Sequence, residues 1–107
     1  MNTQVLPFQA EIREEGEITT LVLIGEINGL ADAAMTAGYE QAEETSPTRI
    51  VLDFSQVDYI NSTGIALVVG LLAKARAAHI PLTAVGLSDH YREIFTITRL
   101  SDFIEIE

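Results

Sequence analysis

The chain has 107 residues, of which 48% are apolar and 21% are charged, which is enough apolar material for a core and too much for a disordered chain. This length predicts one domain over residues 1–107 that folds alone. Sixteen acidic against six basic residues give a formal net charge of −10, which disfavours nucleic acid as a partner, and the absence of cysteine excludes disulfides and thiolate metal sites.

No targeting or membrane segment is expected. The first residues, Met1–Gln4, lack the basic start and apolar stretch of a signal peptide. The longest apolar run, Ile65–Ala73, is about half as long as a membrane-spanning helix. We therefore expect a cytoplasmic protein that does not enter a membrane, either as a monomer or as a weak homodimer.

Two strands are expected to open the fold as a hairpin. Apolar and polar residues alternate over residues 8–13, and a β-branched segment follows at residues 18–24 after an acidic turn. The Ala-rich segment 30–44 then predicts a helix with Leu30 on its apolar face, although Gly38 weakens that helix.

The middle of the chain predicts the centre of a sheet. The run Arg49–Phe54 is typical of a strand buried on both faces. Residues 55–61 are expected to form a connection, and residues 62–79 a second helix with basic residues near its end. Apolar residues cover more of this helix than one core face needs. Either the helix is buried on several sides, or part of its apolar surface faces a partner.

The last quarter of the chain predicts a strand, a helix and a further strand. Pro81 ends the second helix, residues 82–85 form a short strand, and Ser88 caps a third helix. Residues 103–106 supply an edge strand. The order β-β-α-β-α-β-α-β indicates an α/β fold with a mixed, mostly parallel sheet of about five strands and three or more helices.

Groups for catalysis are scarce. The two histidines, His79 and His90, lack the spacing of a metal site, and no nucleophile elbow supports Ser62 as a catalytic nucleophile. A phosphate-binding glycine-rich loop is also missing from the sequence. We therefore expect no enzyme, no cofactor and no metal.

Asp53 offers a different chemistry, because it is predicted at the C-terminal end of a central strand, where sheets tend to carry functional groups. It could be the phosphoacceptor of a receiver-like domain. A receiver should also have a lysine after a late strand, whereas the only lysine, Lys74, falls in the second predicted helix.

The most specific pattern is Val51–Ala66, which reads VLDFSQVDYINSTGIA. It resembles the signature of the STAS family, the anti-sigma factor antagonists, in which an aliphatic-Asp-aliphatic-Ser strand end precedes Asp-Ser-Ser/Thr-Gly-aliphatic-Gly/Ala. Gly25-Glu26 stands where the family has Gly-Glu-Leu-Asp, and Thr98-Arg99-Leu100 resembles its Ser/Thr-Gly-Leu. The resemblance therefore covers nearly the whole chain.

The resemblance implies an anti-sigma factor antagonist in a partner-switching pathway that regulates transcription. Ser62, with Thr63 as the alternative, matches the serine that an anti-sigma factor with serine kinase activity phosphorylates, and a serine phosphatase reverses that step. The unphosphorylated chain would bind the kinase, and the phosphorylated chain would release it. The implied contact surface consists of Glu26, Asn28, Asp58, Tyr59, Ile60, Asn61, Ser62, Thr63, Gly64 and Leu67.

Ser62 precedes the second predicted helix, where its hydroxyl suits a plain N-cap as well as a phosphoacceptor, because first-turn N–H groups can bind either a cap or an anion. Gly64 would leave the approach to Ser62 open. Asn61 replaces the usual Asp of the family, which keeps the shape and removes a charge beside an incoming phosphate. A STAS-like chain can also be a non-signalling subunit of a transport or other complex, and the residues leave this alternative open.

Overall fold

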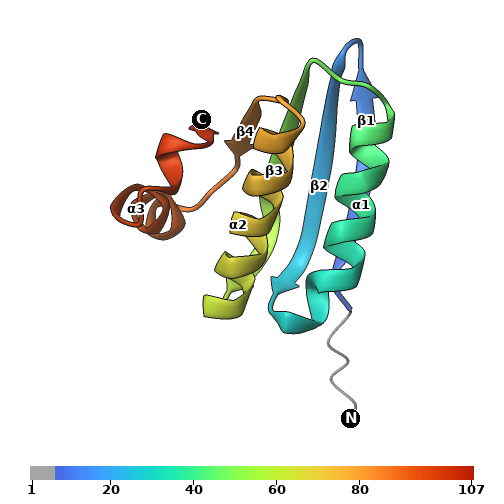
Figure 1. The fold of residues 1–107 in the computed structure, drawn as a ribbon. Helices are drawn as coiled ribbons and strands as arrows, with labels where there is room; N and C mark the ends of the chain where they lie inside the picture. The colour runs from blue at the N-terminus through green and yellow to red at the C-terminus, as the bar shows by residue number, and fades with distance from the viewer. Residues whose placement is uncertain (1–6) are drawn as a thin grey trace.

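The computed structural model describes residues 7–107, so the expectations about the first six residues lie outside the described residues. The predicted order of strands and long helices is confirmed, and two short 3-10 helices are added to it (Figure 1). In chain order the elements are β1 (Gln9–Glu15), β2 (Ile18–Ile27), η1 (Gly29–Ala31), α1 (Asp32–Glu44), β3 (Arg49–Ile60), α2 (Ser62–Ala77), β4 (Leu82–Val85), α3 (Asp89–Ile97), η2 (Leu100–Asp102) and β5 (Glu105–Ile106).

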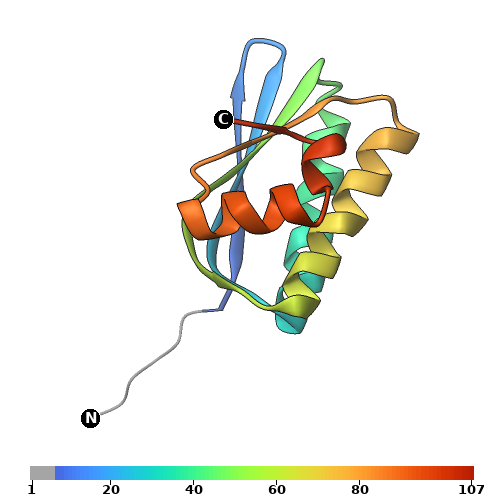
Figure 2. The same ribbon diagram turned by 90° about the vertical axis from the view of Figure 1, so that its left-hand side faces the viewer.

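The five strands form one sheet in the order β1-β2-β3-β4-β5, in which β1 is antiparallel to β2 and every later pair is parallel. This confirms the predicted α/β class with a mixed, mostly parallel sheet. Each parallel strand is added on the same side of its predecessor, so right-handed crossovers place the helices on one face. Accordingly, α1 and α2 lie side by side over one face of the sheet, and α3 lies toward the β4 edge (Figures 1 and 2).

The core lies between this sheet face and the helices. On α2 the buried side chains recur at helical spacing, and on β3 alternate residues point into the core. Gly38, which weakens α1 as an isolated helix, has a packing role here. A Cβ atom at Gly38 would lie 2.9 Å from the Ala10 Cβ atom, so the glycine lets α1 approach β1 closely. The buried α2 and β3 side chains are Val68, Leu71, Leu72, Ala75, Ile50, Leu52 and Phe54.

Strand β3 differs from its prediction in two ways. It continues to Ile60 instead of ending at Phe54, because the long strand β2 pairs with it as far as Ile27, across two register shifts. The expected connection over residues 55–61 is therefore mostly strand. The prediction of burial on both faces is also wrong, since Val51 and Asp53 are only half-buried on the face away from α1 and α2.

The three long helices share one way of ending. Ser46, His79 and Arg99 follow α1, α2 and α3, and all three have left-handed backbone angles, with φ of 54°, 59° and 66°. A left-handed residue after a helix turns the chain away and satisfies the last carbonyl groups. Helix α2 consequently stops at Ala77, two residues before the predicted end at His79.

Candidate functional site

Two asparagines begin helices at one edge of the sheet. Ile27 and Ile60 are paired in register on the parallel strands β2 and β3, so the residues that follow them, Asn28 and Asn61, leave the sheet side by side. The Asn28 side chain accepts a hydrogen bond from the Leu30 N–H at 2.9 Å, which caps η1. The Asn61 Oδ1 atom accepts one from the Gly64 N–H at 2.7 Å, which caps α2.

Asn61, not Ser62, is therefore the N-cap of α2, which corrects the assignment made from the sequence. The cap needs extended backbone, and Asn61 has it, with φ −87° and ψ −179°. Ser62 is the first helical residue and is exposed. Among the hydrogen bonds of residues 7–107, none uses the Ser62 hydroxyl, so this group is available to react without disturbing the cap.

Gly64 does not leave an open approach to Ser62, as the sequence suggested, because it is buried against the end of β2. A Cβ atom there would overlap the carbonyl oxygen of Ile27 and lie 2.8 Å from its carbonyl carbon. The same Ile27 oxygen accepts a hydrogen bond from the Asn61 N–H at 3.2 Å. The first turn of α2 is thus held directly on the backbone of β2.

Leu30 is a surface residue, so the prediction that it lies on the apolar face of the first helix is wrong. It belongs to η1, ahead of α1, and is 92% exposed. η1 lies against the first turn of α2, since a Cβ atom at Gly29 would be 3.6 Å from the Thr63 Cγ2 atom. The Asn28-Gly29 pair was the available signal, because such pairs form turns and set the next residue apart from the helix.

The predicted contact residues divide into exposed and buried groups. Glu26 is paired with Tyr59 in register, and the Tyr59 side chain is 52% exposed. Ile60 and Gly64 are buried, so their role in the site is to shape it, and Leu67 is half-buried. The exposed members beside Ser62 are Asp58, Tyr59 and Thr63.

Tyr91 is a residue of the site that the sequence analysis did not find. β4 ends opposite Asp53, so the second half of β3 has no strand on that side. The Tyr91 hydroxyl of α3 takes the place of a strand there: it accepts a hydrogen bond from the Ile60 N–H at 2.8 Å and donates one to the Ile60 carbonyl oxygen at 3.3 Å. No signal in the sequence indicates this contact.

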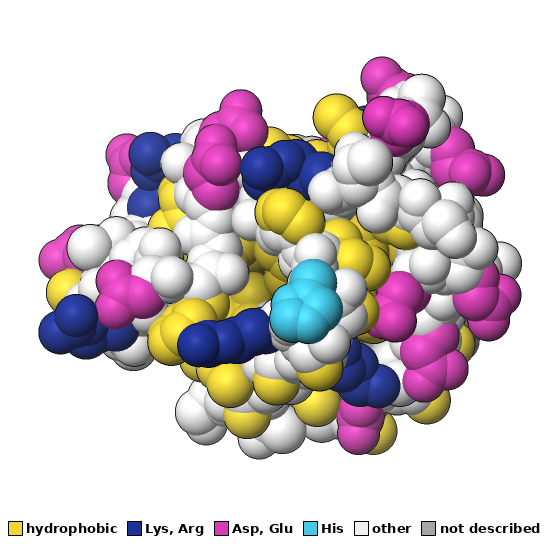
Figure 3. Space-filling model, turned by 45° about the horizontal axis from the view of Figure 1, so that its top comes forward, with side chains coloured by type: hydrophobic (Ala, Val, Ile, Leu, Met, Phe, Trp, Pro, Cys, Tyr) yellow, Lys and Arg dark blue, Asp and Glu magenta, His cyan; other side chains and the backbone are white. Residues whose placement is uncertain are grey.

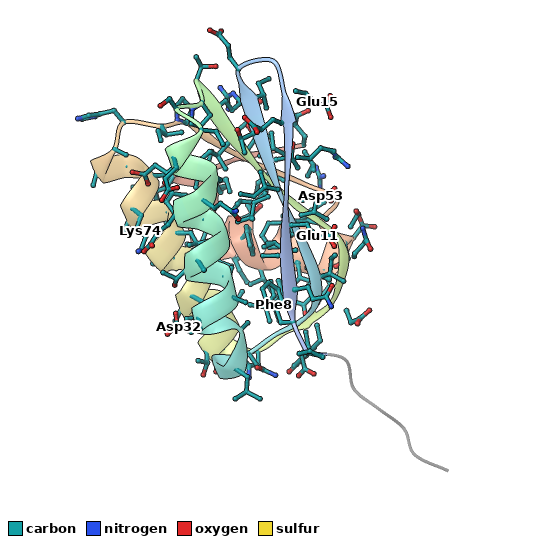
Figure 4. All side chains as sticks on the ribbon, turned by 90° about the vertical axis from the view of Figure 1, so that its right-hand side faces the viewer. Phe8, Glu11, Glu15, Asp32, Asp53 and Lys74 are labelled. Carbon is teal, nitrogen blue, oxygen red and sulfur yellow. The ribbon has the colours of Figure 1, made fainter. Side chains whose placement is uncertain are left out.

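Asp53 and Lys74 lie on opposite sides of the sheet (Figure 4). The Asp53 carboxylate accepts a hydrogen bond from the Ser55 N–H at 2.9 Å, whereas the Lys74 Nζ atom lies 3.6 Å from a Glu40 carboxylate oxygen. These two groups therefore cannot act together as a receiver site requires. Within residues 7–107, no three His, Cys, Asp or Glu side chains converge as metal ligands, and no helix combines the length and apolar character needed to cross a membrane.

Comparison with known proteins identifies the family. A family model described as "Mlab, STAS domain" matches residues 10–105. An anti-sigma-B factor antagonist of Listeria monocytogenes is 31% identical over 98 residues, which cover 91% of this chain and 86% of that protein.

Two solved structures share the fold. An anti-sigma factor antagonist from Mycobacterium paratuberculosis has a TM-score of 0.76 at 16% identity, covering 92% of this chain and 84% of that one. The Bacillus cell fate determinant SpoIIAA in its phosphorylated form has a TM-score of 0.68 at 23% identity, covering 94% and 90%. The chain therefore belongs to the STAS domain family of anti-sigma factor antagonists, which are regulatory proteins and not enzymes.

Proposed function

We propose that this chain binds an anti-sigma factor with serine kinase activity while Ser62 is unphosphorylated and releases it when Ser62 carries a phosphate. The observation that carries this proposal is the position of Ser62, which is exposed at the first residue of α2 while Asn61 holds the cap. A kinase can modify such a hydroxyl without unfolding the helix end. Thr63 is also exposed and is the alternative acceptor.

The proposed contact surface combines residues of η1, the end of β3 and the first turns of α2. Leu30 on η1 and Tyr59 on β3 offer exposed apolar area, and tyrosine is among the residues that most often dominate the binding energy of an interface. The Asn28 and Asn61 caps fix the backbone at the starts of η1 and α2. The polar rim and the remaining contacts come from Glu26, Asp58, Thr63 and Leu67, and the buried residues Ile60 and Gly64 support the surface from below.

A phosphate on Ser62 changes this surface more than it changes the fold. It adds about −1.5 to −2 charges at neutral pH. The positive end of the α2 dipole tolerates that charge, and the N–H groups of Ser62 and Thr63 have no partner among the hydrogen bonds of the described residues. A partner already packed around Ser62 would have to accommodate a hydrated dianion in its interface. Binding is therefore lost while the domain stays folded.

The test uses candidate serine kinases from the same genome that carry the anti-sigma function, each purified and incubated with the chain and ATP. Mass spectrometry should place the phosphate on Ser62, and a serine phosphatase should remove it. Ser62→Ala should keep the kinase bound and block phosphorylation. Ser62→Asp should weaken binding by about tenfold or more, which corresponds to about 1.4 kcal/mol.

Ser101→Asp is the matched control, because Ser101 is exposed in η2, at a distance from α2's first turn, and takes the same charge. It should leave binding unchanged. Equal binding by wild type and Ser62→Asp, or a phosphate on Ser101 instead of Ser62, would contradict the proposal.

A second candidate function has support because the description of the matching family model, "Mlab, STAS domain", names no sigma-factor system. In that case the chain would be a non-signalling subunit of a transport or other complex. Its partner would bind with the same affinity to wild type, Ser62→Ala and Ser62→Asp. The same binding series therefore separates the two functions.

A further inference from the structure

A groove with an apolar floor lies at the C-terminal end of α2, roughly 20 Å along the helix from Ser62. Two hollows of about 510 and 230 Å³ meet there and share Leu72, Arg76 and Phe103. We call it the Phe103 groove, and its lining includes Val69, Leu72, Arg76, Pro81, Leu100 and Phe103.

Apolar side chains in this groove are open to solvent. Phe103 is 54% exposed and Val69 is 43% exposed, although both are large enough to be core residues. Val69 lies on the part of α2 that the core does not cover, so some of the apolar surface of α2 faces outward. Figure 3 looks onto this end of the molecule and shows apolar surface lying between basic side chains and a histidine.

Arg76 is the arginine that lines both hollows of the groove. Four of the six Lys and Arg side chains have a carboxylate within 4 Å, namely Arg13, Arg49, Lys74 and Arg99. Arg76 has none among the described residues, although the chain has a net charge of −10. Its guanidinium instead lies over the Phe103 ring, 5.2 Å from the ring centroid. Asp102 also lines the groove, but its carboxylate is turned to Arg99 at 3.0 Å.

We propose that the Phe103 groove binds an acidic segment of a second protein partner that carries an apolar or aromatic anchor side chain. The anchor enters the hollow beside Phe103, and a carboxylate of the segment pairs with Arg76, whose planar guanidinium can bind both oxygens. His79 lies on the same rim and offers a further hydrogen bond. This site does not depend on Ser62, because it lies at the other end of α2.

Charge argues against a second copy of this chain as the occupant. A two-fold contact brings the same patch of both copies together, so both Arg76 side chains would enter one interface, and the Asp102 carboxylate that lines the groove is already paired with Arg99. An acidic segment instead supplies carboxylates to Arg76, which has no carboxylate partner among the described residues.

The test uses the full chain labelled with ¹⁵N and two synthetic peptides with the same Leu and Phe anchors, one spaced by Glu and the other by Lys. The Glu peptide should cause saturable shifts in the amide signals of Leu72, Arg76 and Phe103. The Lys peptide should cause no saturable shifts there. Arg76→Glu should weaken binding of the Glu peptide by about tenfold or more.

Arg92→Glu is the matched control, because Arg92 on α3 is exposed and also lacks a carboxylate partner among the described residues, yet does not line the groove. It should not change the affinity, and neither should Ser62→Asp. Equal binding of both peptides, shifts that gather elsewhere, or no saturable binding up to about 2 mM would overturn the proposal, since a site weaker than that contributes under about 4 kcal/mol. Shifts in the groove that grow with protein concentration alone would identify a second copy as the occupant and would equally overturn it.

Discussion

Gly64 in the first turn of α2 touches the backbone carbonyl of Ile27 at the end of β2 so closely that a Cβ atom at Gly64 would overlap it. The contact fixes the height and direction of the first turn relative to the sheet. Because Ser62 and Thr63 belong to that turn, the same contact positions them, and Thr63 lies against Gly29 of η1. The glycine of the family signature therefore has a packing role in this chain, and it controls the site indirectly.

Gly64→Ala should destabilise the protein by about 2 kcal/mol or more, because backbone atoms of β2 cannot move aside as a flexible side chain could. Gly70→Ala on the same helix is the control: a Cβ atom there meets nothing within 4 Å. That change should stabilise by about 0.5–1 kcal/mol through helix propensity. Urea unfolding of both variants measures the difference, and equal effects would refute the packing role of Gly64.

Asn61→Ala should lower the free energy of unfolding by about 1 kcal/mol, because it removes the side-chain acceptor for the Gly64 N–H. The free energy of unfolding of Asn61→Asp should stay within a few tenths of a kcal/mol of the wild-type value, since a carboxylate oxygen accepts the same hydrogen bond at a helix N-terminus. Denaturant midpoints of the three proteins test this. If Asn61→Ala were as stable as wild type while Ser62→Ala lost the 1 kcal/mol, the cap would belong to Ser62 after all.

Much of the fold follows from local signals, and the exceptions come from contacts between separate elements. Period-2 and helical patterns, separated by Pro47, Pro81 and the glycines, predicted every strand and long helix in order. The end of β3 was missed because Ser55, Gln56 and Asp58 are polar and the alternation from Gln56 to Tyr59 covers only four residues. Only pairing with the long strand β2 makes them a strand, and a tertiary partner of this kind leaves no signal in the segment itself.

The site was predictable as a segment but not in its details. The Asn61-Ser62-Thr63-Gly64 motif indicated the right helix end. Asn and Ser are nearly equal as N-caps, so propensity could not choose between neighbours, and the backbone angles decide it. The exposure of Leu30 and the contact of Tyr91 with Ile60 depend on how separate elements meet in space, which no local pattern records.

Tyr91→Phe should release the end of β3, because the Ile60 N–H and carbonyl oxygen lose the hydroxyl that binds both. The free energy of unfolding should fall by about 1–2 kcal/mol. Amide hydrogen exchange should accelerate at Ile60 and Asn61 more than at Leu52, which lies in the paired half of β3. Unchanged exchange at Ile60 would mean that Tyr91 does not support the loop that carries Ser62.

Tyr39 should make the protein sensitive to alkali. It is fully buried, and its hydroxyl has no hydrogen-bond partner among the described residues. Burial, with the Glu43 charge as the second cause, raises the pKa of Tyr39 far above its ordinary value of 10.0. Below pH 10 the phenol is neutral in both the folded and the unfolded chain. Above pH 10 the unfolded chain loses the proton first, so stability falls as pH rises, by about 1 kcal/mol between pH 10 and 11 from this group.

Tyr39→Phe tests both consequences of that burial. At pH 7 the variant should be at least as stable as wild type, and up to about 1 kcal/mol more stable, because an unsatisfied hydroxyl leaves the core. Between pH 10 and 11 it should lose about 1 kcal/mol less than wild type. Tyr59→Phe is the control for removing a tyrosine hydroxyl, since Tyr59 is half exposed and lies outside the core. A Tyr39→Phe protein that is clearly less stable at pH 7 would contradict the unsatisfied hydroxyl, and a Tyr39→Phe protein that loses as much stability as wild type between pH 10 and 11 would assign the alkaline loss to another group.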